Sequence, residues 1–208
     1  MKSFLLMGQS NMAGRGDFGE VPPIRNSRCF MLRNGLWQPM NEPICFDRGI
    51  EPVGKYGFHS GTCLAASFAD CASRYFKEDI GLIPCAEGDT SLSQWQPGEI
   101  LFDHAVSITR LAMRTSDLAG ILWHQGESDS VSLNLVHAYH DQFMNMYSAL
   151  VQVLHAENLP FLVGGLGDFT GGYHNGECVY FQEINNILSK LPKKTNNIAF
   201  VPANGLTC

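Results

Sequence analysis

Three short polar segments of this sequence each follow an apolar run and contain residue types that could carry out acyl transfer. They are Gly8-Gln9-Ser10-Asn11, Glu87-Gly88-Asp89-Thr90-Ser91 and His124-Gln125-Gly126-Glu127-Ser128-Asp129. A serine that attacks an ester needs an exposed position on a rigid scaffold, a base within hydrogen-bond reach and donors directed at the oxyanion. Ser10 meets the first requirement and is the candidate nucleophile.

Ser10 also has a simpler interpretation. Gly, Ser and Asn all favour turns for backbone reasons, so the first segment could be only a turn after a strand. Its context also differs from the Gly-x-Ser-x-Gly elbow of the α/β-hydrolases, because Met12 stands where the second glycine would be. A nucleophilic Ser10 therefore requires a different hydrolase scaffold.

The other two segments offer groups that could stabilise an oxyanion. Gly88 would let a backbone N–H approach with no side chain in the way, and Gln125 could present an amide N–H. Glu127 and Asp129 could orient neighbouring groups or receive substrate hydroxyls. The alternatives are a turn glycine at position 88 and a helix N-cap at Ser128 or Asp129.

The apolar pattern predicts the elements that must position these segments. The expected strands, buried on both faces, are Ser3–Met7, Ile80–Pro84, Ala119–Trp123, Pro160–Gly164 and Asn197–Val201, with a weaker sixth at Cys29–Arg33. The expected amphipathic helices are Cys63–Phe76, Leu101–Arg114, Leu133–Glu157 and Val179–Lys190. This alternation predicts one α/β domain over residues 1–208, with helices on both faces of a parallel sheet. Since ligands bind beyond the carboxyl ends of such strands, the three polar segments are expected to converge at one rim.

Composition excludes several classes of partner. A net charge of −6 with no basic run longer than Lys193-Lys194 predicts no nucleic acid and no anionic membrane as a partner. The apolar run near Met1 is too short for a secretory signal or a membrane span, so we expect a cytoplasmic protein. The 7 cysteines are irregularly spaced with no CxxC pair, which predicts mostly apolar core residues and no metal site.

In this order, "GQSNMAGRG", "AEGDTSLSQW" and "ILWHQGESDS" resemble the blocks of the SGNH hydrolases. The resemblance covers most of the chain and is closest to the sialate O-acetylesterase and acetylxylan esterase branch, carbohydrate esterase family six. It implies a flavodoxin-like three-layer α/β/α fold with a central five-stranded parallel sheet, and removal of O-acetyl groups from carbohydrates. It also implies that Ser10 is the nucleophile, that the Ser10 and Gly88 N–H groups and the Gln125 side chain form the oxyanion hole, and that Glu127 is a supporting acid.

The expected substrate is a small acetylated sugar or oligosaccharide, with no metal ion or organic cofactor. We expect Gln9, Asn11, Trp95 and His124 to contact it, with His124 acting as an orienting residue rather than as the base. The loop-rich stretch 14–61 is expected to pack over the rim and to shape the pocket.

The resemblance places the catalytic acid and base in an Asp-x-x-His motif after the last strand, where this sequence reads Asn204-Gly205-Leu206-Thr207-Cys208. We therefore expect the chain to be incomplete at its C-terminus. His59 and His174, on expected loops, are weak stand-ins for the base. The sets Asp103-His104 and His137-x-x-His140-Asp141 fall on expected helices, away from the rim.

Two other functions remain open at this stage. A catalytically inactive homologue could hold a sugar through Trp95, Gln125 and Glu127 without hydrolysing it. An SGNH esterase or thioesterase could instead act on lipid-like esters. A rim rich in Gln, Asn, Asp and Glu favours hydroxyl-bearing substrates over acyl chains.

Overall fold

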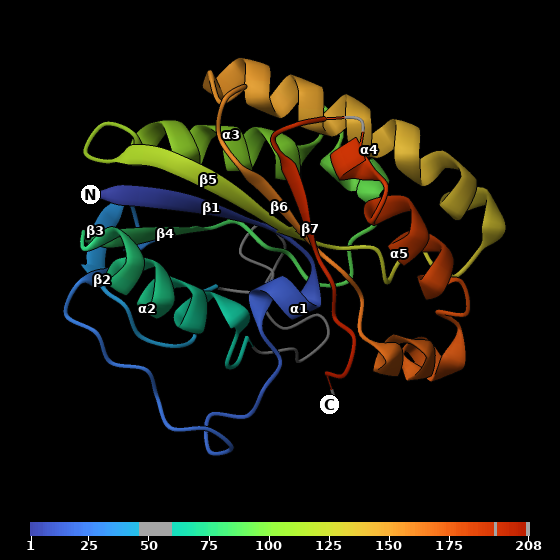
Figure 1. Ribbon diagram of the computed structural model, residues 1–208, viewed down its shortest axis with the longest axis horizontal. Coiled ribbons are helices and arrows are strands. Elements are labelled where there is room, and N and C mark those ends of the chain that lie inside the picture. Colours follow the sequence, from blue (N-terminus) through green and yellow to red (C-terminus); the bar gives the residue numbers. More distant parts are fainter. Residues whose placement is uncertain (46–59, 194, 207–208) are drawn as a thin grey trace.

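A seven-stranded sheet forms the centre of the computed structural model, which describes residues 1–45, 60–193 and 195–206 (Figure 1). The strands are β1 (Lys2–Gly8), β2 (Cys29–Arg33), β3 (Leu36–Pro39), β4 (Ile80–Pro84), β5 (Asp117–His124), β6 (Phe161–Gly164) and β7 (Ile198–Val201). Their order across the sheet is β3-β2-β4-β1-β5-β6-β7. Neighbouring strands are parallel throughout, except for the antiparallel pair β2 and β3.

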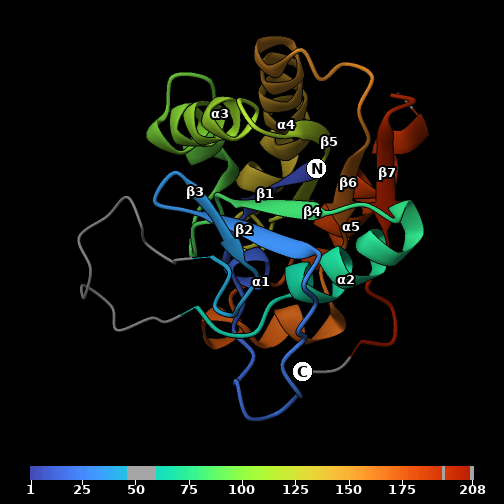
Figure 2. The ribbon, with the colours of Figure 1, turned by 90° about the vertical axis from the view of Figure 1, so that its left-hand side faces the viewer.

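Helices cover both faces of this sheet (Figure 2). The α-helices are α1 (Ser10–Ala13), α2 (Leu64–Phe76), α3 (Ile100–Ala112), α4 (Leu133–Leu154) and α5 (Phe181–Leu188). Short 3₁₀ helices are η1 (Leu92–Trp95), η2 (Asp168–Gly172), η3 (His174–Gly176) and η4 (Leu191–Lys193). The apolar sides of α3, α4 and α5 pack on one face, and those of α1 and α2 on the other. This arrangement confirms the predicted three-layer α/β/α fold.

Strand β1 shows why the strand sequences are apolar without alternation. Leu5 and Met7 point to the core beneath α3 and α4, whereas Phe4 and Leu6 point to the core beside α2. All four side chains are buried. Because both faces of the sheet are covered by helices, apolar residues are favoured at successive positions of a central strand rather than only at alternate ones.

The sheet has seven strands rather than the five expected for its centre. Strand β2 confirms the weaker sixth strand predicted at Cys29–Arg33, whereas β3 was not predicted and lies within the stretch expected to be mostly loop. The indole N–H of Trp37 in β3 donates to Thr115 Oγ1 at 3.0 Å. Its ring also lies over Gly81 of β4, where an added Cβ would approach it to 2.6 Å. Trp37 thus holds the hairpin on the sheet. Residues 46–59, including His59, lie outside the described part of the chain.

The other predicted strands and the four predicted helices lie where the sequence pattern places them, with boundaries that differ by a few residues. Helix α1 and the short 3₁₀ helices were not predicted. Within the described residues, no helix is long and apolar enough to cross a membrane. The cysteines that the structure describes are free thiols, and all are buried apart from exposed Cys71. This confirms the expectation that most cysteines are core residues.

The strand order places three carboxyl ends side by side. After β1 the chain builds β2, β3 and β4 on one side of β1 and then crosses to build β5 on the other. Such a reversal point is where ligands bind in open α/β sheets. The polar segments that follow β4, β1 and β5 therefore meet at one rim, as predicted.

Candidate active site

The end of β1 brings Ser10 against the end of β5. The Gln9 N–H donates to the His124 carbonyl oxygen at 2.9 Å. Gly8 has a φ of +131°, and an added Cβ would lie 2.0 Å from the same carbonyl oxygen. Only glycine permits this approach of the two backbones. The chain then turns into α1, of which Ser10 is the first, partly buried residue.

Gly8→Ala should therefore destabilise the protein by about 3 kcal/mol, because it combines an unfavourable positive φ with a backbone clash. Gly98→Ala is the matched control, since Gly98 also has a positive φ, of +91°, but has no other atom within 4 Å of the added Cβ. Urea unfolding of both variants measures the difference. Equal losses of stability in the two variants would show that a Cβ at position 8 does not clash with the His124 backbone.

The second polar segment joins the same point from β4. The Glu87 N–H donates to the Gly8 carbonyl at 3.0 Å, and the Thr90 hydroxyl donates to the Glu87 carbonyl at 2.8 Å. Gly88 lies within this turn and is buried. A backbone hydrogen bond therefore joins the segment that carries Gly88 to the segment that carries Ser10.

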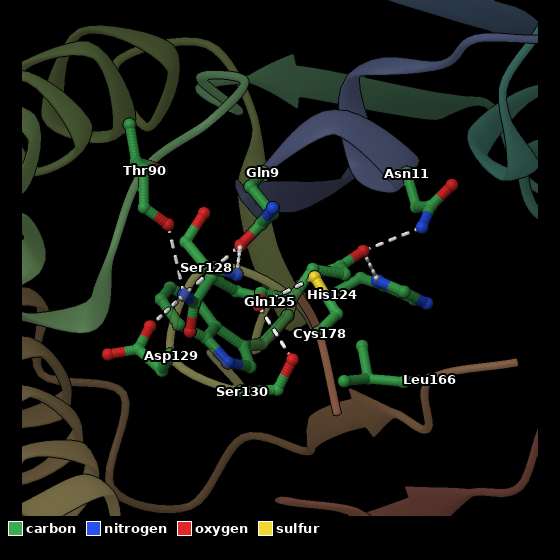
Figure 3. Close-up of polar contacts among 12 residues, drawn as sticks. Gln9, Asn11, Thr90, His124, Gln125, Ser128, Asp129, Ser130, Leu166 and Cys178 are labelled. Atoms are coloured by element: carbon green, nitrogen blue, oxygen red, sulfur yellow. Dashed lines mark hydrogen bonds and ion pairs between the residues drawn. The ribbon is translucent and has the colours of Figure 1, made fainter. Parts of the chain in front are cut away.

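Gln125 lies at the centre of the hydrogen bonds beneath the rim (Figure 3). Its Nε2 donates to the Thr90 carbonyl at 3.0 Å and to Asp129 Oδ2, while its Oε1 accepts from the Tyr139 hydroxyl at 3.1 Å. The Gln9 Oε1 atom lies 3.2 Å from the same nitrogen. Gln125 is fully buried, so an oxyanion would have to displace one of these acceptors. Its place in an oxyanion hole stays a prediction.

Asp129 is a buried carboxylate held by neutral donors. Its Oδ2 accepts from the Leu92 backbone N–H at 2.9 Å and from Gln125 Nε2. The pKa of Asp129 is raised to about 6, mainly by burial and to a smaller extent by the nearby charge of Glu127, while the hydrogen bonds from Gln125 and Leu92 oppose the shift. Asp129 is therefore ionised at neutral pH but takes up a proton in mild acid.

This raised pKa predicts how stability depends on pH. Because the folded pKa lies above the ordinary value of 3.8, the folded protein binds more protons than the unfolded chain between these two values. The free energy of unfolding contributed by Asp129 therefore falls as pH rises through about 6. Asp129→Asn should remove this decrease, so that the variant gains stability relative to wild type as pH rises from about 4.5 to 7. Urea unfolding of both proteins across this range tests it, and parallel curves would contradict it.

Glu127 joins the residue after Ser10 to the end of β5. It is fully buried, and its Oε1 accepts from Asn11 Nδ2 at 2.6 Å and lies 3.9 Å from His124 Nδ1. Its backbone carbonyl accepts from Ser130 Oγ at 2.7 Å and from Cys178 Sγ at 3.4 Å. Glu127 can therefore hold both Asn11 and His124 in place, which agrees with the expected supporting role without testing it.

His124 is packed tightly but keeps a partly exposed edge. Its side chain is 13% exposed. An added Cβ at Gly164 of β6 would lie 2.7 Å from its Cδ2 atom, so the ring rests directly on the neighbouring strand. Asn11 and His124 remain partly accessible at the rim, as contacts to a substrate require.

Two residues predicted to contact substrate are buried instead. Trp95 is wholly inaccessible, its indole N–H donates to Thr90 Oγ1 at 3.1 Å, and its ring packs edge-on against Trp123 at 5.5 Å. Gln9 is 1% exposed, and its Oε1 also accepts from the Ser128 N–H at 3.3 Å. The prediction that these two side chains bind sugar is therefore wrong. Trp95 is a core residue, and Gln9 belongs to the hydrogen-bond network under Ser10.

The remaining histidines lie on other elements. His104 lies on α3, and His137 and His140 lie on α4, as predicted. His174 begins η3. Within residues 1–45, 60–193 and 195–206, no three His, Cys, Asp or Glu side chains gather in a way that could hold a metal ion.

Tyr139 and Thr90 are the residues of the site that the sequence analysis did not single out. Tyr139 lies on the buried side of α4, and burial raises the pKa of its hydroxyl well above the usual value. A buried tyrosine hydroxyl needs a hydrogen-bond partner. This need was the signal in the sequence that Tyr139 takes part in a polar contact. Its partners, the side chain and carbonyl of Gln125, lie on a different element.

The fold has three layers, and a serine follows the first strand of its sheet. A glycine turn follows one neighbouring strand and a Gln-x-Glu segment follows the other. This is the arrangement of an SGNH hydrolase. The whole chain, residues 1–208, matches the family described as carbohydrate esterase, sialic acid-specific acetylesterase, and belongs to it. This confirms the family that the sequence blocks resemble.

Several known proteins are similar to this chain. A probable carbohydrate esterase of Arabidopsis thaliana, At4g34215, is 27% identical over 222 residues, which cover 98% of this chain and 79% of that protein. The crystal structure of the Arabidopsis protein superposes with a TM-score of 0.84 at 26% identity, covering 100% of this chain and 87% of that one. NanS superposes with a TM-score of 0.74 at 17% identity, covering 98% and 78% of the two chains. XAC1771, a carbohydrate acetylesterase from Xanthomonas citri, superposes with a TM-score of 0.62 at 15% identity, covering 96% of this chain and 49% of that one. The last two likenesses show the shared fold.

Proposed function

We propose that this protein is a serine esterase that removes O-acetyl groups from acetylated carbohydrates, of the acetylxylan or sialate type. The observation that carries the proposal is the position of Ser10. It is partly exposed where three strand ends meet, and it lies two residues after Gly8, whose close approach to the His124 backbone leaves no room for a side chain. The carbohydrate acetylesterase family to which the chain belongs supports the same chemistry.

In the proposed reaction, Ser10 Oγ attacks the acetyl carbonyl carbon while a general base accepts its proton. The resemblance implies that this base is a histidine. The backbone N–H groups of Ser10 and Gly88 stabilise the oxyanion together with the Gln125 side-chain amide, which first releases one of its present acceptors. The sugar oxygen then departs with the proton that the base supplies. Water then attacks the acetyl carbonyl carbon of the acetyl-enzyme and gives a proton to the base. The base passes this proton to Ser10 Oγ as its bond to the acetyl group breaks, which releases acetate and restores the hydroxyl.

The polar groups around the rim support a carbohydrate rather than a lipid. Asn11 and His124 offer hydrogen-bonding groups beside Ser10. Beyond the ends of β6 and β7 lies a cavity of about 360 Å³, whose polar lining includes Asp168, Gln182 and Asn204. Amide and carboxylate groups suit sugar hydroxyls better than they suit an acyl chain.

Acetate release from acetylated sugars tests the proposal. The full protein, expressed from its own gene, should release acetate from acetylated xylan or acetylated sialic acid faster than it hydrolyses a long-chain ester. Binding of the acetylated sugar without release of acetate would indicate an inactive carbohydrate-binding homologue. Faster hydrolysis of the long-chain ester would indicate a lipid-directed enzyme.

A further inference from the structure

We propose that Asp129 is a positioning residue, whose ionised carboxylate joins the segment that carries Gly88 to the segment that carries Gln125. Its effect on turnover rests on the proposed esterase function, whereas its effect on the geometry of the rim does not.

Two hydrogen bonds join these segments, and both depend on Asp129. Its Oδ2 accepts from the Leu92 N–H, which belongs to the chain that leaves β4. The same oxygen accepts from Gln125 Nε2, and this nitrogen also donates to the Thr90 carbonyl. Asp129 thus orients the amide that makes the second link. Removing its carboxylate would break one link directly and would free the Gln125 amide to turn.

The rest of the network transmits this constraint to the residues around it. Tyr139, from α4, donates to both oxygens of Gln125, at 2.9 and 3.1 Å. The side-chain amide of Gln9 lies 3.2 Å from Gln125 Nε2, and Gln9 directly precedes Ser10. The position of the Gln125 amide is therefore coupled to the segment that carries the nucleophile.

The carboxylate of Asp129 is held by neutral donors only. Within the described residues, the titratable groups that act on it are Glu127, on its own segment, and Tyr139, on α4. The group that faces it from η1 is the neutral N–H of Leu92. Since hydrogen bonds to an ionised carboxylate are stronger than those to a neutral acid, protonation weakens both links. The raised pKa, about 6, places this change in mildly acidic solution.

The kinetic test compares wild type with Asp129→Asn and Asp129→Ala. Asparagine keeps an oxygen that can accept both hydrogen bonds but removes the charge, so kcat at neutral pH should fall about tenfold, and in the alanine variant about 100-fold. KM should change less than about threefold, because Asp129 does not contact the substrate. Urea unfolding shows which variants are folded, and Asp129→Asn alone decides the test if the alanine variant is not.

The pH profile separates positioning from a purely structural role. The ratio of wild-type kcat to that of Asp129→Asn should fall towards one as pH is lowered through about 6, because wild type then also carries a neutral group at this position. The ratio cancels the titration of the general base, which both proteins share. A ratio that is constant with pH, or equal kcat values at neutral pH, would overturn the proposal.

A second measurement needs no enzymatic activity. The indole N–H groups of Trp95 and Trp123 contact Thr90 Oγ1 and the Tyr139 hydroxyl, at 3.1 and 3.5 Å, whereas that of Trp37 contacts Thr115 at the edge of the sheet. Their NMR signals should follow a transition with a midpoint near pH 6 in wild type, with the Trp37 signal as the internal control. Asp129→Asn should abolish this transition. Its absence in wild type, or its persistence in the variant, would overturn the proposal even if the protein proved not to be an esterase.

Discussion

Ser10→Ala is expected to reduce the hydrolysis of acetylated sugars by about three orders of magnitude or more, because no acetyl-enzyme can form without the hydroxyl. The fold should persist. Among the described residues, none hydrogen-bonds the Ser10 hydroxyl, so its loss leaves no buried group unpaired. The rate of acetate release and the urea unfolding curve of the same preparation measure the two effects separately.

The matched control is Ser107→Ala, which removes an exposed hydroxyl from α3 on the opposite side of the core. It should change neither kcat nor stability. If folded Ser10→Ala retained wild-type turnover, Ser10 would be only a turn residue, as its Gly, Ser and Asn neighbours also allow. The hydrolysis would then need another nucleophile.

Gln125→Ala is expected to lower kcat about 100-fold or more if the amide contributes to the oxyanion hole, directly or after releasing one of its present acceptors. It should also lower stability by about 3 kcal/mol, because the buried Asp129 carboxylate and Tyr139 hydroxyl each lose a partner. Kinetics on acetylated sugars and urea unfolding should be measured on the same preparation.

Gln152→Ala, on the exposed side of α4, makes the same chemical change away from the rim and should leave both quantities near wild type. A folded Gln125→Ala protein with unchanged kcat would exclude this amide from the oxyanion hole. In that case, its role would be limited to holding the three segments together.

The central strands and the rim were predictable because each of their features is local in sequence. A run such as Phe4 to Met7 is apolar at every position, as is favoured in a strand with two covered faces. The polar segments follow those runs directly, so the topology alone brings them to one edge. The close approach of Gly8 to His124 could not be predicted in this way, because it depends on the register in which β1 pairs with β5.

The hairpin of β2 and β3 had a signal that the sequence analysis did not use. Asn34-Gly35 is the dipeptide typical of a two-residue hairpin turn, and both residues have positive φ, of 52° and 76°. The burial of Trp95 had no such signal. An indole beside polar residues can face solvent or the core, and only the packing of Trp123 against it decides which.

The hydrogen-bond network under the rim could not be predicted, because its members come from four separate parts of the chain. Gln9, Thr90 and Tyr139 meet at Gln125 only after the sheet and α4 have packed. Residue type indicates that each buried polar group needs a partner, but not which one it finds.

The measurement that tests the central claim most directly is the identification of the acetylated residue. The full protein should be mixed with an activated acetyl ester, quenched in acid within the first turnover, digested and analysed by peptide mass spectrometry. The proposed mechanism predicts one acetyl group on the peptide that carries Ser10, and none in Ser10→Ala. Acetylation of a different residue, or steady hydrolysis with Ser10 unmodified at every time point, would contradict it.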